Sequence, residues 1–379
     1  MLKRGEAISI ALGGSIALAA GIGIGRFVYT PILPPMVEAL GLSKSMAGLI
    51  ASANFLGYLV GALGAAMPML PGSRRLWLLG ALAVSALTTA AMGLTQALPA
   101  FLILRFVGGV ASAFALVLAS AVVLEHLAES DHAGLSSLHF GGVGIGIAAS
   151  AVLVATMLRA TATWQSLWLA SGILSLVAML VVAVLLRDQS RPPPRRIGPA
   201  ARTDKRALAR IIVAYGLVGF GYVITATFLV AIVRSTSAIR PLEPVIWVVF
   251  GLAIVPSSAF WRRISIPLGV PKAFALACLT EATGVAVSVS QQGKVAVFLA
   301  AILVGGTFVS LMALGMERAR GLAAGDSRRV LAWMTSAFGL GQIVGPAFAG
   351  IVADRLGAFT VPSIVAAVAL SLAAGLAIR

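Results

Sequence analysis

Three ionisable side chains lie inside long apolar stretches of the sequence, where a charge is costly. Arg26 and Arg105 are basic, and Glu281 is the acidic residue that lies deepest in such a stretch. A charge inside a membrane span costs at least about 3 kcal/mol, so it normally faces a cavity or a partner. The two guanidinium groups could bind a carboxylate or a phosphate through paired hydrogen bonds. Alternatively, each arginine caps backbone carbonyls or anchors helix packing.

Glu281 has a different chemistry, because a carboxyl group can bind and release a proton. Proton-coupled carriers need a group of this kind, and burial disfavours the charged form of a carboxyl. We therefore treat Glu281 as a proton-coupling candidate. Its alternative role is structural, as a neutral carboxyl that is hydrogen-bonded inside the protein.

Uncharged polar and aromatic side chains in the same stretches are candidate substrate contacts. Asn54 and Tyr58 are four residues apart, which places them on one helical face. The remaining candidates are Tyr29, Thr30, Tyr222, Thr225, Phe308 and Gln342. Polar side chains also form hydrogen bonds between helices in membranes, so each of these residues has a structural alternative.

The composition excludes an ordinary soluble domain. Hydrophobic residues make up 60% of the chain and charged residues 11%, and the mean hydropathy is +1.03. A soluble domain has about 25% charged residues. This much apolar surface requires lipid as the solvent, so we expect a membrane protein. The net charge of +16 then belongs to loops at the membrane surface, and we expect no nucleic-acid partner.

The apolar stretches predict twelve transmembrane helices, since a span needs roughly 20 apolar residues. Helices are expected because an isolated segment in lipid must satisfy its own backbone. The predicted spans are about 8–32, 45–68, 76–96, 99–124, 136–158, 164–186, 209–233, 242–261, 271–290, 294–316, 329–352 and 358–378.

The distribution of Lys and Arg predicts the orientation of the chain. If the N-terminus is cytoplasmic, twenty basic residues flank the spans on the cytoplasmic side and six on the other. This is the expected positive-inside bias. We therefore expect a multi-pass protein of a bacterial inner membrane with both termini in the cytoplasm.

The segment 187–208 separates two sets of six spans, 1–186 and 209–379. It contains Pro192-Pro193-Pro194 and a dense cluster of basic residues. We interpret it as a cytoplasmic linker that lies on anionic lipid. Because six is an even number, both halves begin on the same side of the membrane. The fold class that we predict is therefore an all-α membrane protein with two parallel six-helix repeats.

A near-constant offset indicates that the two halves are copies of one unit. Gly21 and Gly23 recur as Gly219 and Gly221, which are 198 residues further on. Val107-Gly108-Gly109 and Val304-Gly305-Gly306 repeat at an offset of 197, and Gly141 and Gly339 at 198. With these offsets Arg26 corresponds to Ile224 and Arg105 to Ile302. Both arginines are absent from the second copy, so we expect the substrate near positions where the copies differ.

Several local sequences carry a family resemblance. They are Gly25 to Met36, Asn54 to Ala62, Gly306 to Phe308 and Gly339 to Pro346. Together with twelve spans in two halves, they resemble the YbfB/YjiJ branch of the major facilitator superfamily. The segments Arg105 to Gly109 and Gly141 to Gly146 are similar to the superfamily patterns in spans 4 and 5. The loop after span 2 keeps Arg74 and Arg75 but lacks the acidic residue of the superfamily's cytoplasmic gate.

The resemblance implies a function and a place for the two arginines. In the resembled fold, spans 1, 4, 7 and 10 line a central cavity. Counting about 1.5 Å per residue, Arg26 and Arg105 lie roughly 9 Å outside the midplane, at one level of that cavity. We therefore predict a monomeric secondary transporter that works by alternating access. Its substrate is a small organic anion or another small polar solute.

Other function classes remain as alternatives at the sequence level. A proton-driven exporter of lipophilic compounds would need an acid and apolar walls, which Glu281, Phe220, Phe228 and Phe308 could supply. A receptor or scaffold lacks support, since no soluble sensor domain is evident. We expect no enzyme, no cofactor and no metal, because the three histidines lack zinc spacing and the loops have no nucleophile–base set.

Overall fold

The computed structural model describes residues 4–65, 72–129, 132–186, 204–290, 293–322 and 327–378. Helices are its regular elements. In the first half they are α1 (Arg4–Leu18), the π-helical turn η1 (Ala19–Ile24), α2 (Tyr29–Leu40), α3 (Lys44–Ala65), α4 (Arg74–Ala91), η2 (Met92–Leu94), α5 (Leu98–Glu129), η3 (Ala133–Leu135), α6 (Ser136–Arg159) and α7 (Trp164–Leu185). In the second half they are α8 (Lys205–Ser235), η4 (Arg240–Leu242), α9 (Glu243–Leu268), α10 (Val270–Ser290), α11 (Lys294–Leu322), α12 (Ser327–Leu356) and α13 (Thr360–Ile378).

The described part of the chain contains twelve helical segments that are long and apolar enough to cross a membrane. This confirms the prediction of an all-α membrane protein with twelve spans. Large apolar side chains such as Leu94, Ile266 and Val295 are exposed on the surface, which suits a lipid environment. Most of the predicted linker 187–208 lies outside the described residues. α8 already begins at Lys205, ahead of the predicted 209, because Asp204 caps it by accepting hydrogen bonds from the N–H groups of Arg206 and Ala207.

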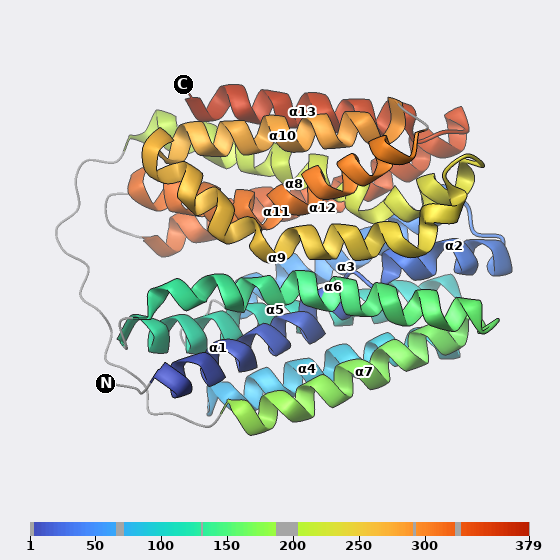
Figure 1. Ribbon diagram of the computed structural model, residues 1–379, viewed down its shortest axis with the longest axis horizontal. Coiled ribbons are helices and arrows are strands. Elements are labelled where there is room, and N and C mark those ends of the chain that lie inside the picture. The colour runs from blue at the N-terminus through green and yellow to red at the C-terminus, as the bar shows by residue number, and fades with distance from the viewer. Residues whose placement is uncertain are drawn as a thin grey trace.

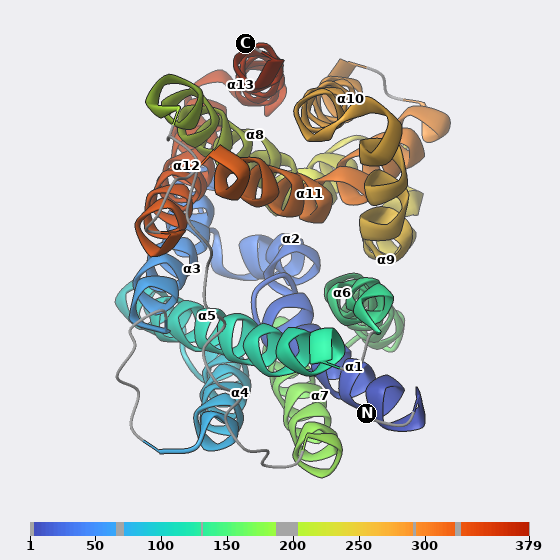
Figure 2. The same ribbon diagram turned by 90° about the vertical axis from the view of Figure 1, so that its left-hand side faces the viewer.

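The helices form two bundles that lie side by side. Helices α1 to α7 occupy one side of the molecule and α8 to α13 the other (Figure 1). The end-on view in Figure 2 shows two seams between them, where α3 lies against α12 and α6 against α9. α2 leaves its own bundle and packs against α8. These contacts bring one side of α2 and α3 next to the second half of the chain.

Glycines allow the helices at the seams to approach closely. A Cβ atom on Gly144 would collide with the carbonyl oxygen of Gly251, and one on Gly251 would lie 2.7 Å from the carbonyl oxygen of Gly144. On the other seam, Gly48 faces the carbonyl of Pro346, and Gly350 faces the carbonyl of Lys44. Small residues at such contacts are the usual way for membrane helices to pack backbone against backbone.

The first span is interrupted rather than continuous. It runs from Arg4 to Leu40, which is longer than the predicted 8–32, and it changes from α-helix to π-helix at Ala19. The N–H of Gly25 bonds to the carbonyl of Ala20 at 2.9 Å, five residues back. Pro31 has no N–H to donate to Phe27, whose carbonyl accepts from Thr30 at 3.2 Å instead. The result is a break at residues 25–28, just where Arg26 lies.

One end of the bundles carries the turn from α2 to α3, and we call it the Gly41 end. Gly41 has a φ of 63°, which favours glycine, and it closes α2 with an N–H donated to the carbonyl of Val37. α8 is the seventh span and α12 the eleventh. The chain has crossed an odd number of spans at the end of each, as it has at the end of α2, so these helix ends also lie at the Gly41 end. The two halves are joined there by hydrogen bonds described below.

Candidate functional site

Arg26 lies in the break of the first span with part of its guanidinium group unsatisfied. The residue is 4% exposed. Its guanidinium carbon lies 4.4 Å from the ring centre of Phe55 and 4.3 Å from that of Tyr58, both on α3. In the described part of the protein, its Nε and Nη2 atoms have no hydrogen-bond partner. A buried cation is thus held between aromatic rings with one donor edge left empty.

Arg105 on α5 faces the same break, but its guanidinium group donates hydrogen bonds to backbone carbonyls. Its Nη1 donates to the carbonyl oxygen of Gly25 at 3.1 Å, and its Nη2 donates to that of Arg26 at 2.9 Å. These carbonyls lie where the π-helical turn and Pro31 disturb the regular helix ladder. Arg105 therefore caps carbonyls, which is the alternative role considered above. The two arginines do not present matching guanidinium groups to one substrate in this conformation.

Three of the predicted contact residues also engage backbone atoms. Asn54 donates from Nδ2 to the carbonyl of Arg105 at 2.8 Å, and Tyr29 donates its hydroxyl proton to the carbonyl of Ala47 at 2.8 Å. Thr30 donates to the carbonyl of Ala226 at 2.8 Å, which links α2 to α8 across the two halves. These side chains hold the helices around Arg26 in place.

The second half contributes a polar and aromatic group from α8, α11 and α12. The rings of Tyr222 and Phe308 stack with centres 5.1 Å apart and an interplanar angle of 7°. Gln342 donates from Nε2 to the Tyr222 hydroxyl. The Oε1 atom of Gln342 and the hydroxyl of Thr225 are buried and have no partner among the described residues. Both could accept a hydrogen bond from a bound molecule.

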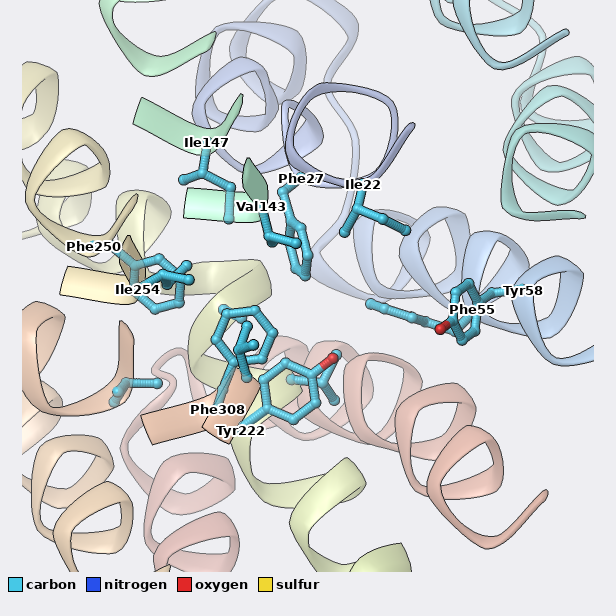
Figure 3. Close-up of a cluster of buried hydrophobic side chains, with 14 of the residues drawn as sticks. Ile22, Phe27, Phe55, Tyr58, Val143, Ile147, Tyr222, Phe250, Ile254 and Phe308 are labelled. Atoms are coloured by element: carbon cyan, nitrogen blue, oxygen red, sulfur yellow. The ribbon is translucent and has the colours of Figure 1, made fainter. Parts of the chain in front are cut away.

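An aromatic contact connects the two halves next to Arg26. The rings of Phe27 and Phe308 lie 5.8 Å apart at an angle of 66°, and Figure 3 shows them pointing toward one another. Trp247 lies 6.5 Å from Phe27, and it stacks on Phe250 at 4.4 Å. Sequence reasoning missed Phe27, Trp247 and Phe250. The available signals were the adjacency of Phe27 to Arg26 and the three-residue spacing of the other two on one helical face.

Glu281 lies on α10 and is completely buried, with an exposed fraction of 0%. In the described structure, neither of its carboxyl oxygens has a hydrogen-bond partner. The Thr307 hydroxyl lies beside it, but its proton is directed at the carbonyls of Leu303 (2.7 Å) and Val304 (3.1 Å). The carboxyl is therefore an unsatisfied ionisable group on the opposite half from Arg26.

The rings that an exporter cavity would require have different partners. Phe220 packs against Phe348 at 5.6 Å, and Phe228 stacks on Phe359 at 4.5 Å. Phe228 lines a cavity of about 520 Å³ at the Gly41 end, whereas Phe308 lies in the aromatic contact with Phe27. No group of three His, Cys, Asp or Glu side chains in the described residues could hold a metal ion.

Reciprocal helix caps join the halves at the Gly41 end. The carboxylate of Asp354 on α12 accepts from the backbone N–H groups of Lys44 (2.9 Å) and Ser45 (2.8 Å), which begin α3. In return, Lys44 Nζ donates to the carbonyls of Ala353 (3.1 Å) and Gly357 (2.8 Å) at the end of α12. Each helix therefore supplies a side chain that satisfies the other helix's terminus.

An ion-pair network lies beside these caps. Arg234 at the end of α8 donates from Nε to Glu38 of α2 at 2.7 Å and from Nη2 to the same carboxylate. Its Nη1 donates to Glu243 of α9 at 2.8 Å. We refer to the Asp354–Lys44 caps and the Arg234–Glu38 pair together as the Gly41-end latch. The latch keeps the two halves together at this end of the molecule.

Solved structures with the same arrangement of helices identify the fold. A mutant of the nucleoside transporter NupG matches with a TM-score of 0.74 and 14% identity, covering 98% of both chains. A bacterial homolog of the human lysosomal transporter Spinster, inward-facing and unoccupied, gives 0.73 and 14%, covering 99% of this chain and 97% of that one. The same homolog, inward-facing and occupied, gives 0.72 and 13%, covering 98% and 95%. The fold is that of the major facilitator transporters.

The family follows from the sequence itself. Residues 18–378 match the family model described as "Uncharacterised MFS-type transporter YbfB". The chain belongs to this family of secondary transporters, which confirms the predicted resemblance. No curated protein matches the chain.

Proposed function

We propose that the protein carries a small organic anion across the membrane and that Arg26 binds its acidic group. The observation that carries this proposal is the empty donor edge of Arg26, formed by Nε and Nη2. These two N–H groups point in parallel and match the two oxygens of a carboxylate or phosphate. An anion there would neutralise a buried charge that otherwise has no counterion in the described structure.

The surroundings of Arg26 support an anion site rather than a site for a neutral solute. Phe55 and Tyr58 cover the guanidinium group and keep water away, and an ion pair is stronger where water is excluded. Gln342 and Thr225 would contribute acceptors from the second half. An acid that also carries a hydroxyl or amide donor would use groups from both bundles.

We further propose that transport proceeds by alternating access. The Gly41-end latch holds the halves together at one end, which is the outer end in the predicted orientation. A carrier closed at this end would exchange its substrate with the cytoplasm. This orientation, the bacterial inner membrane, cytoplasmic termini and a monomeric state are parts of the same proposal.

The alternative of a proton-driven exporter of lipophilic compounds has less support. Its predicted walls were Phe220, Phe228 and Phe308, and these rings have separate partners. An apolar substrate would also leave the donor edge of Arg26 empty.

Uptake into proteoliposomes tests the proposal. Wild-type protein is supplied with radiolabelled gluconate, succinate and inorganic phosphate, and compared with Arg26→Gln, Arg26→Lys and the exposed control Arg263→Gln. We expect at least one anion to enter with wild type and the control. Uptake should be absent with Arg26→Gln and reduced about 10-fold or more with Arg26→Lys, because charge-assisted hydrogen bonds contribute about 1.5–3 kcal/mol. Equal uptake by all four proteins would reject the anion site.

A further inference from the structure

In the described residues, buried ionisable side chains with unpaired polar atoms lie on both halves, among them Arg26 and Arg105 in the first and Glu281 in the second. Arg26 lies in the first span and Glu281 on α10, and both are almost or completely inaccessible. The described structure contains no ion pair for either residue. Burying either charge without a partner therefore costs free energy, unless a buried charge of opposite sign offsets it.

Among the described residues, no charged side chain lies directly beside Glu281. α10 packs against α8, α9, α11 and α13. Among the described residues, the titratable groups that interact electrostatically with Glu281 are Cys278 on its own helix and Tyr222 on α8. The charged residues of α9 and α11 lie toward the helix ends, and α13 has none between Thr360 and Ile378.

A short chain of contacts connects the two sites. Glu281 lies beside Thr307, and the next residue, Phe308, meets Phe27, which directly follows Arg26. Tyr222 stacks on Phe308 and lies within electrostatic reach of both Arg26 and Glu281. Phe27 and Phe308, which meet at the contact between the halves, are thus each next in sequence to a residue at one of the two sites (Figure 3).

We propose that Glu281 is the proton-binding site of the carrier and that one proton moves together with each monovalent anion. This inference rests on the proposed anion site at Arg26. When the anion is bound, it neutralises Arg26, and Glu281 is neutral if it holds a proton. When the anion leaves, Arg26 is positive, and an ionised Glu281 balances it. Arg105 adds the same buried positive charge to both states, so the net charge of the interior is equal in the loaded and the empty carrier.

This balance makes anion binding and proton binding mutually favourable. A bound anion removes the positive charge that stabilises ionised Glu281, so the proton binds more tightly, and by linkage the proton strengthens anion binding to the same degree. The proton enters from the water on the side from which the anion comes, and both leave on the other side. Transport of a monovalent anion is therefore electroneutral and driven by a pH gradient.

The experiment compares net uptake with exchange in proteoliposomes, using radiolabelled gluconate as the monovalent probe, with succinate and inorganic phosphate alongside. Glu281→Gln mimics the protonated acid, and the exposed Glu317→Gln is the matched control. We expect Glu281→Gln to exchange internal for external anion at the wild-type rate, because the loaded carrier is unchanged. Its net uptake driven by a pH gradient should fall to background, because the empty carrier has an unbalanced Arg26.

Two further measurements complete the test. Glu281→Asp keeps a titratable group and should recover net uptake, and an imposed membrane potential should not alter gluconate uptake by wild type. Net uptake by Glu281→Gln at the wild-type rate would overturn the proton site while leaving the Arg26 site intact. Loss of exchange in Glu281→Gln with an unchanged melting curve would also overturn it. Failure of the anion site itself appears separately, as uptake and exchange that survive in Arg26→Gln.

Discussion

Arg105 donates a 2.9 Å hydrogen bond from Nη2 to the backbone carbonyl of Arg26. The two arginines therefore have different roles. Arg105 holds the interrupted backbone of the first span, and Arg26 projects from that backbone with a free donor edge. Arg105 is a positioning residue for Arg26, since its second bond, to Gly25, secures the residue before it.

Replacing Arg105 should destabilise the protein more than replacing a surface arginine. The carbonyls of Gly25 and Arg26 are held by two separate nitrogens of the guanidinium fork, and the shorter lysine side chain, with its donors on one nitrogen, does not reproduce that geometry. Each lost hydrogen bond from a buried charged group costs about 1.5–3 kcal/mol. We expect Arg105→Lys to lower the melting temperature in detergent clearly below that of Arg74→Lys. Arg74 pairs with Glu125 while 38% exposed, and such pairs contribute about 1 kcal/mol or less. Equal melting temperatures would contradict the capping role.

Removing the charge of Asp354 should open the Gly41 end. An amide at this position cannot satisfy the N–H groups of Lys44 and Ser45 as a carboxylate does, and it loses the favourable interaction with the α3 dipole. The measurement uses Leu33→Cys, which lines the 520 Å³ cavity, in a Cys278→Ala background. We expect Asp354→Asn to accelerate its labelling by a membrane-impermeant maleimide several-fold. Asp204→Asn, at the cap of α8, is the control and should leave the labelling rate unchanged.

A methyl group at the seam between α6 and α9 should impair the conformational cycle. Gly144 and Gly251 lie against each other's backbone, so Gly144→Ala and Gly251→Ala each force the helices apart. We expect slower uptake with little change in the concentration dependence, because neither residue belongs to the Arg26 site. The double variant should be only slightly slower than either single variant, since both act on one contact. Gly80→Ala projects into open space and should transport normally, and additive losses in the double variant would argue against a shared seam.

The Tyr222 hydroxyl should matter mainly as the partner of Gln342. Tyr222→Phe leaves the Gln342 amide buried without an acceptor, which costs about 1–3 kcal/mol. We expect a lower melting temperature, with partial recovery in the double variant Tyr222→Phe/Gln342→Leu, which buries no unpaired amide. A double variant less stable than Tyr222→Phe alone would indicate that Gln342 has a different partner.

The sequence predicted the twelve spans because they depend on local hydrophobicity. The break in the first span was harder to predict, although the residues that favour it are visible in the sequence. They are Gly21, Gly23, Gly25 and Pro31. A π-helical turn forms where neighbouring helices favour it. Gly23 faces the backbone of Gly146 and Gly21 faces Ala115, and neither contact follows from the local sequence.

The roles of the two arginines could not be separated at the sequence level. Their depths along the spans were predictable from a constant rise per residue, but the rotation of each helix was not. The rotation of α5 about its own axis decides whether the Arg105 side chain points into a cavity or toward the carbonyls of Gly25 and Arg26. The same uncertainty applied to Tyr29, Thr30 and Asn54, whose partners are backbone atoms on other helices.

The reciprocal caps between α3 and α12 are bonds that water can replace. Asp354, Lys44 and the helix ends that they satisfy lie near the surface at the Gly41 end, where separation of the halves would admit solvent. Each donor and acceptor would then find a water molecule instead of its partner, so little free energy is lost on opening. A carrier that must change shape at every turnover benefits from such an exchange. Its closed form is specific in geometry, yet it lies only a small step in free energy from the open one.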